Sequence, residues 1–198
     1  MGQDVKIKTE KIFNAYLTLG LLEINKTESD NTFISQTNIW DKLGVETIAQ
    51  KNYIGRYLNN IEQWLSDAGL ANDQIAALIE RKTYGFKLKN NIPAAVHKDF
   101  LGSFLYLNLI EDKEHEKNLD ELMNKEGERP LSLISKLVIA KKSQKFLKIE
   151  YENSENELEY KPEKFSYDNN VWCVIGSLKN AIKTGKIKLE LSKIKKIS

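Results

Sequence analysis

Four polar side chains at helical spacing, between residues 50 and 68, carry the clearest chemical signal in this sequence. At about 100° per residue, Asn52, Arg56, Asn59 and Gln63 fall on one narrow face that contains no carboxylate. Arginine can bond guanine edges, asparagine and glutamine can bond adenine edges, and all three can reach phosphate. The face predicts contact with nucleic acid. A plain solvent-facing helix would also be polar, and periodicity alone favours the two interpretations equally.

A basic hairpin follows this helix in the sequence. Residues 75–79 and 84–88 have the composition of strands, and residues 80–83 between them have that of a turn. Arg81, Lys82, Lys87 and Lys89 would supply phosphate contacts, which give salt-dependent affinity without reading the base sequence. A hairpin whose lysines only face water is the alternative interpretation.

Three helices must position these groups. The first is predicted over residues 6–24 from its apolar spacing, and the second is short, begins after Ser35 and ends at Gly44. The third runs from about residue 50 to residue 68. A short helix, a turn and a longer helix with a polar face follow the order of a helix-turn-helix, and the hairpin would be its wing.

Composition limits the remaining possibilities. The chain has 198 residues, 41% of them apolar, and a formal charge of +2, which suits two domains of about 100 residues each. No apolar run reaches the roughly 20 residues of a membrane span, and no signal peptide is evident, so we expect a cytoplasmic protein. One cysteine, Cys173, and two histidines make a metal site improbable, and we expect no cofactor.

Catalysis is not expected either. Cys173 stands between apolar neighbours, as a packed thiol does, and the sequence has neither a phosphate loop nor a nucleophile elbow.

The middle of the chain predicts a helix over residues 94–110 that is apolar around much of its circumference. One row holds Val96, Phe100, Phe104 and Leu107, and a second holds Leu101, Leu105 and Leu109. Such a helix is buried in its own fold or against a second copy. We favour a homodimer, because many helix-turn-helix proteins bind two half-sites as symmetric dimers. An acidic stretch over residues 111–128 then makes a poor DNA surface.

The last third predicts one helix, over residues 131–142, and several short strands. The strands are expected at residues 146–151, 157–161, 171–177, 187–191 and 194–197. This content suits a small barrel of the Sm-like or SH3-like kind.

Two short motifs in this region carry a family resemblance. Tyr160-Lys161-Pro162 followed by Trp172-Cys173-Val174 resembles the WYL domain, a ligand-sensing barrel found behind DNA-binding modules in bacterial transcription regulators. Residues 149–151 resemble its first strand, and residues 189–194 its closing pair of strands. Gly44-Val45 followed by residues 53–58 is similar to the winged helix of these regulators, with Arg56 at the family's arginine and Tyr57 where aspartate is usual.

The resemblance implies an α+β fold in three parts: a winged helix-turn-helix over residues 1–90, a helical linker over 91–129 and a WYL-like barrel over 130–198. It implies double-stranded DNA as partner and a nucleotide or nucleic-acid effector on the barrel. The DNA-contacting set, from motif and helix face together, is Lys51, Asn52, Tyr53, Arg56, Asn59, Gln63, Arg81, Lys82 and Lys87. The ligand set on the barrel is Tyr151, Lys161, Trp172, Lys179 and Lys193.

Some residues depart from the family pattern. Cys173 stands where the motif has tyrosine, and Lys193 stands where the closing strands have arginine, which alone offers the planar fork that suits phosphate. Trp172 has a second interpretation as a core residue, and the lysines have one as solvated charges.

A different class of function is also open. The charges of residues 1–90 are balanced, which suits a protein-interaction or scaffold module that uses a winged helix and a small barrel without specific DNA binding.

Overall fold

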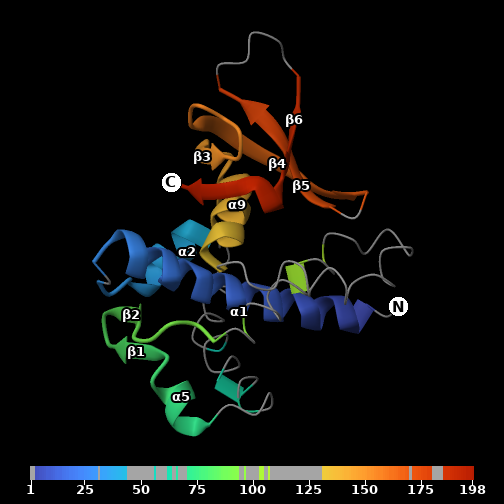
Figure 1. Cartoon of the computed structure of the whole chain (residues 1–198). Helices are drawn as coiled ribbons and strands as arrows, with labels where there is room; N and C mark the ends of the chain where they lie inside the picture. Colours follow the sequence, from blue (N-terminus) through green and yellow to red (C-terminus); the bar gives the residue numbers. More distant parts are fainter. Residues whose placement is uncertain are drawn as a thin grey trace.

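The computed structural model describes residues 3–30, 32–43, 56, 62–63, 66, 71–93, 96, 103–104, 107, 131–169, 171–179 and 185–198. Helices and antiparallel sheets are combined in it, in agreement with the α+β class (Figure 1). The helices described from end to end are α1 (Gln3–Glu28), α2 (Gln36–Leu43), α5 (Asn72–Ala76) and α9 (Leu131–Ser143). The first, second and last of these confirm predicted helices, and α1 is longer at both ends than expected.

Helix α1 lies in the middle of the molecule. It packs against α9 and α2 on one side and against the strand β2 on the other (Figure 1). Every residue from Ala15 to Leu22 is buried, so the helix is covered around its whole circumference there. The sequence predicted that only one apolar stripe of this helix is buried. More of the helix is buried than that, because α2 and α9 cover one side and β2 covers the other.

The hairpin consists of β1 (Ile79–Lys82) and β2 (Gly85–Leu88), joined by a turn at Thr83 and Tyr84. This corrects the predicted strand at residues 75–79 and the turn at residues 80–83. Ile75, Leu78 and Ile79 are all buried, and their spacing of three and four is that of a helical turn, which α5 forms at this place. The returning strand was predicted correctly to within one residue.

A single bridge attaches the hairpin to the segment between α1 and α2. The Ile34 amide donates to the Phe86 carbonyl at 2.8 Å, and the Phe86 amide donates to the Ile34 carbonyl at 2.9 Å. Gly85 permits this approach, because a Cβ there would lie 2.4 Å from the Ile34 carbonyl oxygen.

The second sheet has five strands in the order β6-β5-β4-β3-β7, with every neighbouring pair antiparallel. The strands are β3 (Leu147–Tyr151), β4 (Leu158–Asp168), β5 (Val171–Leu178), β6 (Ile187–Glu190) and β7 (Ile194–Ile197), with the 3-10 helix η1 (Leu191–Lys193) between the last two. Five strands were predicted near these positions. Among the described residues, β6 and β7 form no ladder with each other, so the pairing leaves the sheet open.

Strand β4 is much longer than the predicted strand over residues 157–161. The prediction stopped near Pro162, which cannot donate to a ladder. The structure accommodates the proline at an irregularity, where the register against β5 shifts between Pro162 and Lys164. Beyond it, pairing with β5 continues to Asp168 opposite Val171.

A cluster of aromatic rings connects α1, the residue Phe104 and the five-stranded sheet. The Phe104 ring lies 4.7 Å from that of Phe165 and 5.9 Å from that of Trp172, both in the five-stranded sheet, and 6.0 Å from that of Phe13 on α1. Phe104 is 1% exposed and Val96 is fully buried. Val96 and Phe104 belong to the apolar row over residues 94–110 that favoured a homodimer. Both are already buried within a single chain, so their apolar character does not require a second copy. The homodimer stays a prediction, and Phe100, Leu101, Leu105 and Leu109 lie outside the described residues.

Candidate functional site

The polar helix face is described at two of its four predicted positions. Arg56 and Gln63 are both helical and exposed. Lys51, Asn52, Tyr53 and Asn59, the other helix residues of the DNA-contacting set, lie outside the described residues. Exposed arginine and glutamine side chains on helical residues are chemically able to bond base edges or phosphate.

The hairpin distributes its predicted cations over two faces. Lys87 lies opposite Glu80 in the ladder, and Lys82 lies two residues along from Glu80 on the same face. Arg81 lies opposite Phe86, on the other face of the hairpin. Ile79 lies on that same face and is buried. Arg81 therefore lies on a different face of the hairpin from Lys82 and Lys87.

Two lysines and two aromatic rings make up the outer face of the hairpin. Lys82 Nζ lies 4.7 Å from the centroid of the Phe33 ring and 5.9 Å from that of Tyr84, and Lys87 Nζ lies 5.0 Å from the Phe33 ring. The two rings meet edge to face at 5.1 Å. Tyr84 is 62% exposed, at the tip of the hairpin. An exposed ring beside two ammonium groups can stack on a base or lie against a sugar while the lysines meet phosphate.

Glu80 partly neutralises this face. Its carboxylate lies 3.2 Å from Lys87 Nζ and 3.5 Å from Lys82 Nζ. The hydrogen bond from Lys87 holds the pKa of the Glu80 carboxyl below its ordinary value. The hydrogen bond with Tyr84 raises the pKa of Lys82. Two cations share one anion, and the face keeps a net positive charge.

Arg81 connects the hairpin to the polar helix. Its Nη2 donates to Glu62 Oε1 at 2.7 Å, one residue before the exposed Gln63. A hollow of about 660 Å³ lies at this junction, lined by Gln63, Arg81 and the neighbouring residues Glu62, Ser66, Asn72, Ile75, Ala76 and Ile79. The structure thus brings together two members of the DNA-contacting set, Gln63 and Arg81, that are far apart in the sequence.

The lysines predicted to bind a ligand on the sheet have internal partners. Lys179 pairs with Glu159 at 3.1 Å, and Lys193 pairs with Glu190 at 2.9 Å. The hydrogen bond that Lys193 donates to the Glu190 carboxylate raises the pKa of Lys193. Lys161 lies over the Phe146 ring, with Nζ 5.7 Å from the centroid.

The two aromatic members of the ligand set are held within the sheet. The Tyr151 hydroxyl accepts a hydrogen bond from the Glu190 amide at 3.2 Å. Trp172 is 1% exposed and packs against Phe104. Its position is that of a core residue, and a ligand on the outer surface of the sheet does not reach it. The ligand set on the sheet stays a prediction.

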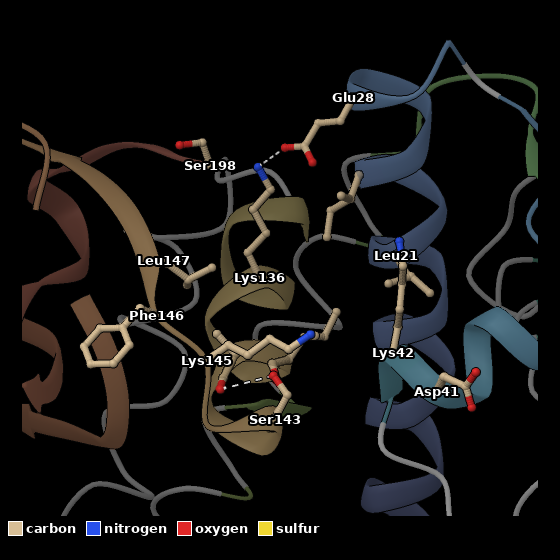
Figure 2. A pocket seen from close by; sticks show the side chains of 13 residues that line it. Leu21, Glu28, Asp41, Lys42, Lys136, Ser143, Lys145, Phe146, Leu147 and Ser198 are labelled. Carbon is tan, nitrogen blue, oxygen red and sulfur yellow. Dashed lines mark hydrogen bonds and ion pairs between the residues drawn. The ribbon is translucent and has the colours of Figure 1, made fainter. Parts of the chain in front are cut away.

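A pocket that the sequence did not predict lies between α1, α2 and α9. It has a volume of about 380 Å³, and Figure 2 shows the side chains that line it, including Lys42, Lys145 and Phe146. No motif marks these residues, which come together only when the N-terminal helices pack on α9. The lining includes no member of either predicted set.

The described residues can also be assessed as metal ligands and as membrane-spanning helices. In the described ranges, no group of three His, Cys, Asp or Glu side chains lies close enough together to hold a metal ion. Of the helices with described residues, none has the length and apolar character needed to cross a membrane.

Comparison with known proteins adds little to this geometry. No model of a protein family matches the chain, and no curated protein is significantly similar to it. Among solved structures, proteasome accessory factor B/C (PafBC) of Arthrobacter aurescens overlaps with a TM-score of 0.30 and 10% sequence identity. The overlap covers 93% of this chain and 38% of that one. A TM-score this low does not establish a common fold, so the assignment of function rests on this chain's own residues.

Proposed function

We propose that this chain is a DNA-binding transcription regulator, built from an N-terminal winged helix and a C-terminal small barrel of the WYL type. The observation that carries the proposal is the junction between Arg81 and Glu62. This ion pair sets the basic hairpin beside the exposed helical residue Gln63. A helix for base edges and an adjacent hairpin for the phosphate backbone are the two parts that a winged helix brings to a duplex.

The order of elements in the first half supports this proposal. Helix α1 is followed by the bridge at Ile34, then by α2, then by the helical residues Arg56, Glu62, Gln63 and Ser66, and finally by the hairpin. Because Ile34 pairs with Phe86, the hairpin is anchored against the segment that separates the first two helices. This anchoring would hold the hairpin tip at a fixed position relative to the exposed helix face.

The second half is proposed to be the small barrel. Its support is the link between β3 and the end of β6, where the Tyr151 hydroxyl accepts from the Glu190 amide. The 3-10 turn η1 then passes directly into β7, which pairs with β3. This contact joins the edge strand β6 to β3, the neighbour of the other edge strand β7, and a curled five-stranded sheet would bring these strands together.

Salt dependence of DNA binding is the direct test. We would measure the affinity of the purified protein for duplexes from the region upstream of its own coding sequence, by fluorescence anisotropy at several salt concentrations. Each phosphate contact contributes roughly 0.9 to the slope of log affinity against log salt. The double variant Lys82→Gln/Lys87→Gln is expected to lower that slope by roughly 1 to 2.

A matched control comes from the five-stranded sheet. Lys179→Gln/Lys193→Gln removes the same charge from lysines that already have carboxylate partners, and it should leave the slope unchanged. Equal effects of the two double variants would assign the slope to net charge alone and overturn the hairpin's role. Absence of any DNA binding at low salt, together with retention of a protein partner, would instead favour the scaffold function.

A further inference from the structure

The pocket between α1, α2 and α9 has the dimensions of a small-molecule site. Its volume of about 380 Å³ falls within the range of about 300–1,000 Å³ that is typical of ligand pockets. It is enclosed by two N-terminal helices on one side and by α9 and the start of β3 on the other (Figure 2). Neither the polar helix face nor the hairpin contributes to it, so a ligand here is independent of the proposed DNA contacts.

The walls of the pocket are apolar. Leu21 and Ile24 line it from α1, Ile139 and Ala140 from α9, and Leu147 from β3. Leu21 is 2% exposed and Ala140 is 3% exposed, so these positions form its floor. A ligand with an apolar body would remove this surface from water.

Two cations reach into the same space. Lys42, from α2, and Lys145, from the connection between α9 and β3, both line the pocket; in Figure 2 the Lys145 side chain extends toward α1, and that of Lys42 lies along α1. Both residues are exposed. In the part of the chain that the structure describes, neither ammonium group has a hydrogen-bond or ion-pair partner.

The acidic side chains at the pocket do not neutralise these two lysines. The Glu28 carboxylate is paired with Lys136, which also donates to the Ile197 carbonyl. The Asp41 carboxylate points away from α9 (Figure 2). Lys136 thereby links α1 and β7 to α9, whereas neither Lys42 nor Lys145 has a carboxylate partner in the part of the chain that the structure describes.

We propose that this pocket binds an amphiphilic monoanion: one carboxylate or sulfonate group on an apolar body. Lys42 and Lys145 would bind the anionic group, and the apolar body would lie against Leu21, Ile139 and Leu147. Such a ligand would contact the N-terminal helices and α9 at once.

The test uses 8-anilinonaphthalene-1-sulfonate, a fluorescent probe with this chemistry, titrated into the full-length protein. Lys42→Gln/Lys145→Gln is expected to weaken probe binding roughly tenfold, because two charge-assisted contacts are lost. Decanoate or 4-phenylbutyrate should displace the probe, and the more potent of the two would tell an aliphatic from an aromatic body. 1-Decanol, which has no charge, should not displace it at matched concentration.

Two further variants separate the pocket from general effects. Lys164→Gln removes an exposed charge from β4, outside the pocket, and should leave probe affinity unchanged. Ser143→Trp keeps the charge of the chain but fills space at the pocket wall, and should also weaken the probe. Melting curves establish that each variant folds. Unchanged probe affinity in a folded Lys42→Gln/Lys145→Gln protein, or equal displacement by 1-decanol, would overturn the proposal.

Discussion

The hairpin and the five-stranded sheet use their lysines differently. In the sheet, Lys179, Lys186 and Lys193 each have a carboxylate partner, at 3.1, 3.0 and 2.9 Å. In the hairpin, Lys82 and Lys87 share the single carboxylate of Glu80 and lie over aromatic rings.

The aromatic residues of the two regions show the same contrast. Trp172 of the sheet is 1% exposed, whereas Tyr84 of the hairpin is 62% exposed. Trp172 is packed inside the sheet, while the hairpin exposes the Tyr84 ring beside two lysines that share one carboxylate. An exposed ring beside lysines is available to a polyanion. This difference favours the hairpin over the sheet as the proposed DNA-binding surface.

Truncating the two aromatic residues should produce the largest difference between the regions. Trp172→Ala is expected to lower the free energy of unfolding by about 3–5 kcal/mol, because it leaves a cavity beside Phe104 and Phe165. Tyr84→Ala should change stability by no more than about 0.5 kcal/mol, since the ring is exposed. Urea denaturation measures both. If the Trp172→Ala protein were as stable as wild type, Trp172 would not be a stabilising core residue.

A smaller loss of stability is expected from a buried hydroxyl in the sheet. The Tyr160 hydroxyl donates toward the Val174 and Ile187 carbonyls, each at 2.9 Å, and burial raises its pKa. Tyr160→Phe leaves these acceptors without that donor, at a cost of about 1–3 kcal/mol. Urea denaturation again provides the measurement, and Tyr167→Phe is the matched change in the same strand. A loss no larger than that of the control would show that water replaces the hydroxyl.

Exposed ion pairs should contribute least, and their effect should depend on pH. The hydrogen bond from Lys186 holds the pKa of the Glu163 carboxyl below its ordinary value of 4.5, and Lys87 does the same for Glu80. A depressed carboxyl pKa stabilises the fold above the unfolded value, and that stability is lost as pH falls through the folded value.

The melting temperatures of Glu163→Gln and Glu80→Gln should therefore fall less steeply than that of wild type as pH drops below about 4.5. The difference should be small, because both carboxylates are solvent-screened. Thermal melts at half-unit pH steps measure it. A steeper fall in the variants would mean that these pairs do not stabilise the folded state.

Sequence periodicity correctly predicted the elements whose apolar residues follow a single period. Helix α9 and strands β5 and β7 were predicted to within about a residue or two, because their apolar positions follow a single helical or alternating period. The first hairpin strand was misplaced because Ile75, Leu78 and Ile79 belong partly to a helical turn and partly to a strand. Strand β4 was cut short because a proline reads as a stop, whereas a register shift can accommodate it.

The candidate sites were predicted less completely than the elements. The sequence indicated Gln63 and Arg81 as DNA contacts, but only the folded chain shows that Glu62 joins their two elements. The pocket that contains Lys42 and Lys145 has no local signature, since its walls come from α1, α2, α9 and β3. Such a site is a product of tertiary packing, and periodicity carries no information about it.

The central claim is that the exposed face carrying Arg56 and Gln63 enters a DNA groove. The most direct test is to select bound fragments from sheared genomic DNA with the purified protein, and then to compare wild type with Arg56→Ala on the selected duplex by anisotropy. Loss of an arginine contact to base or phosphate should weaken binding roughly tenfold or more, with an unchanged melting temperature. If Arg56→Ala altered neither the affinity nor its salt dependence, the helix face would not be the surface that binds DNA.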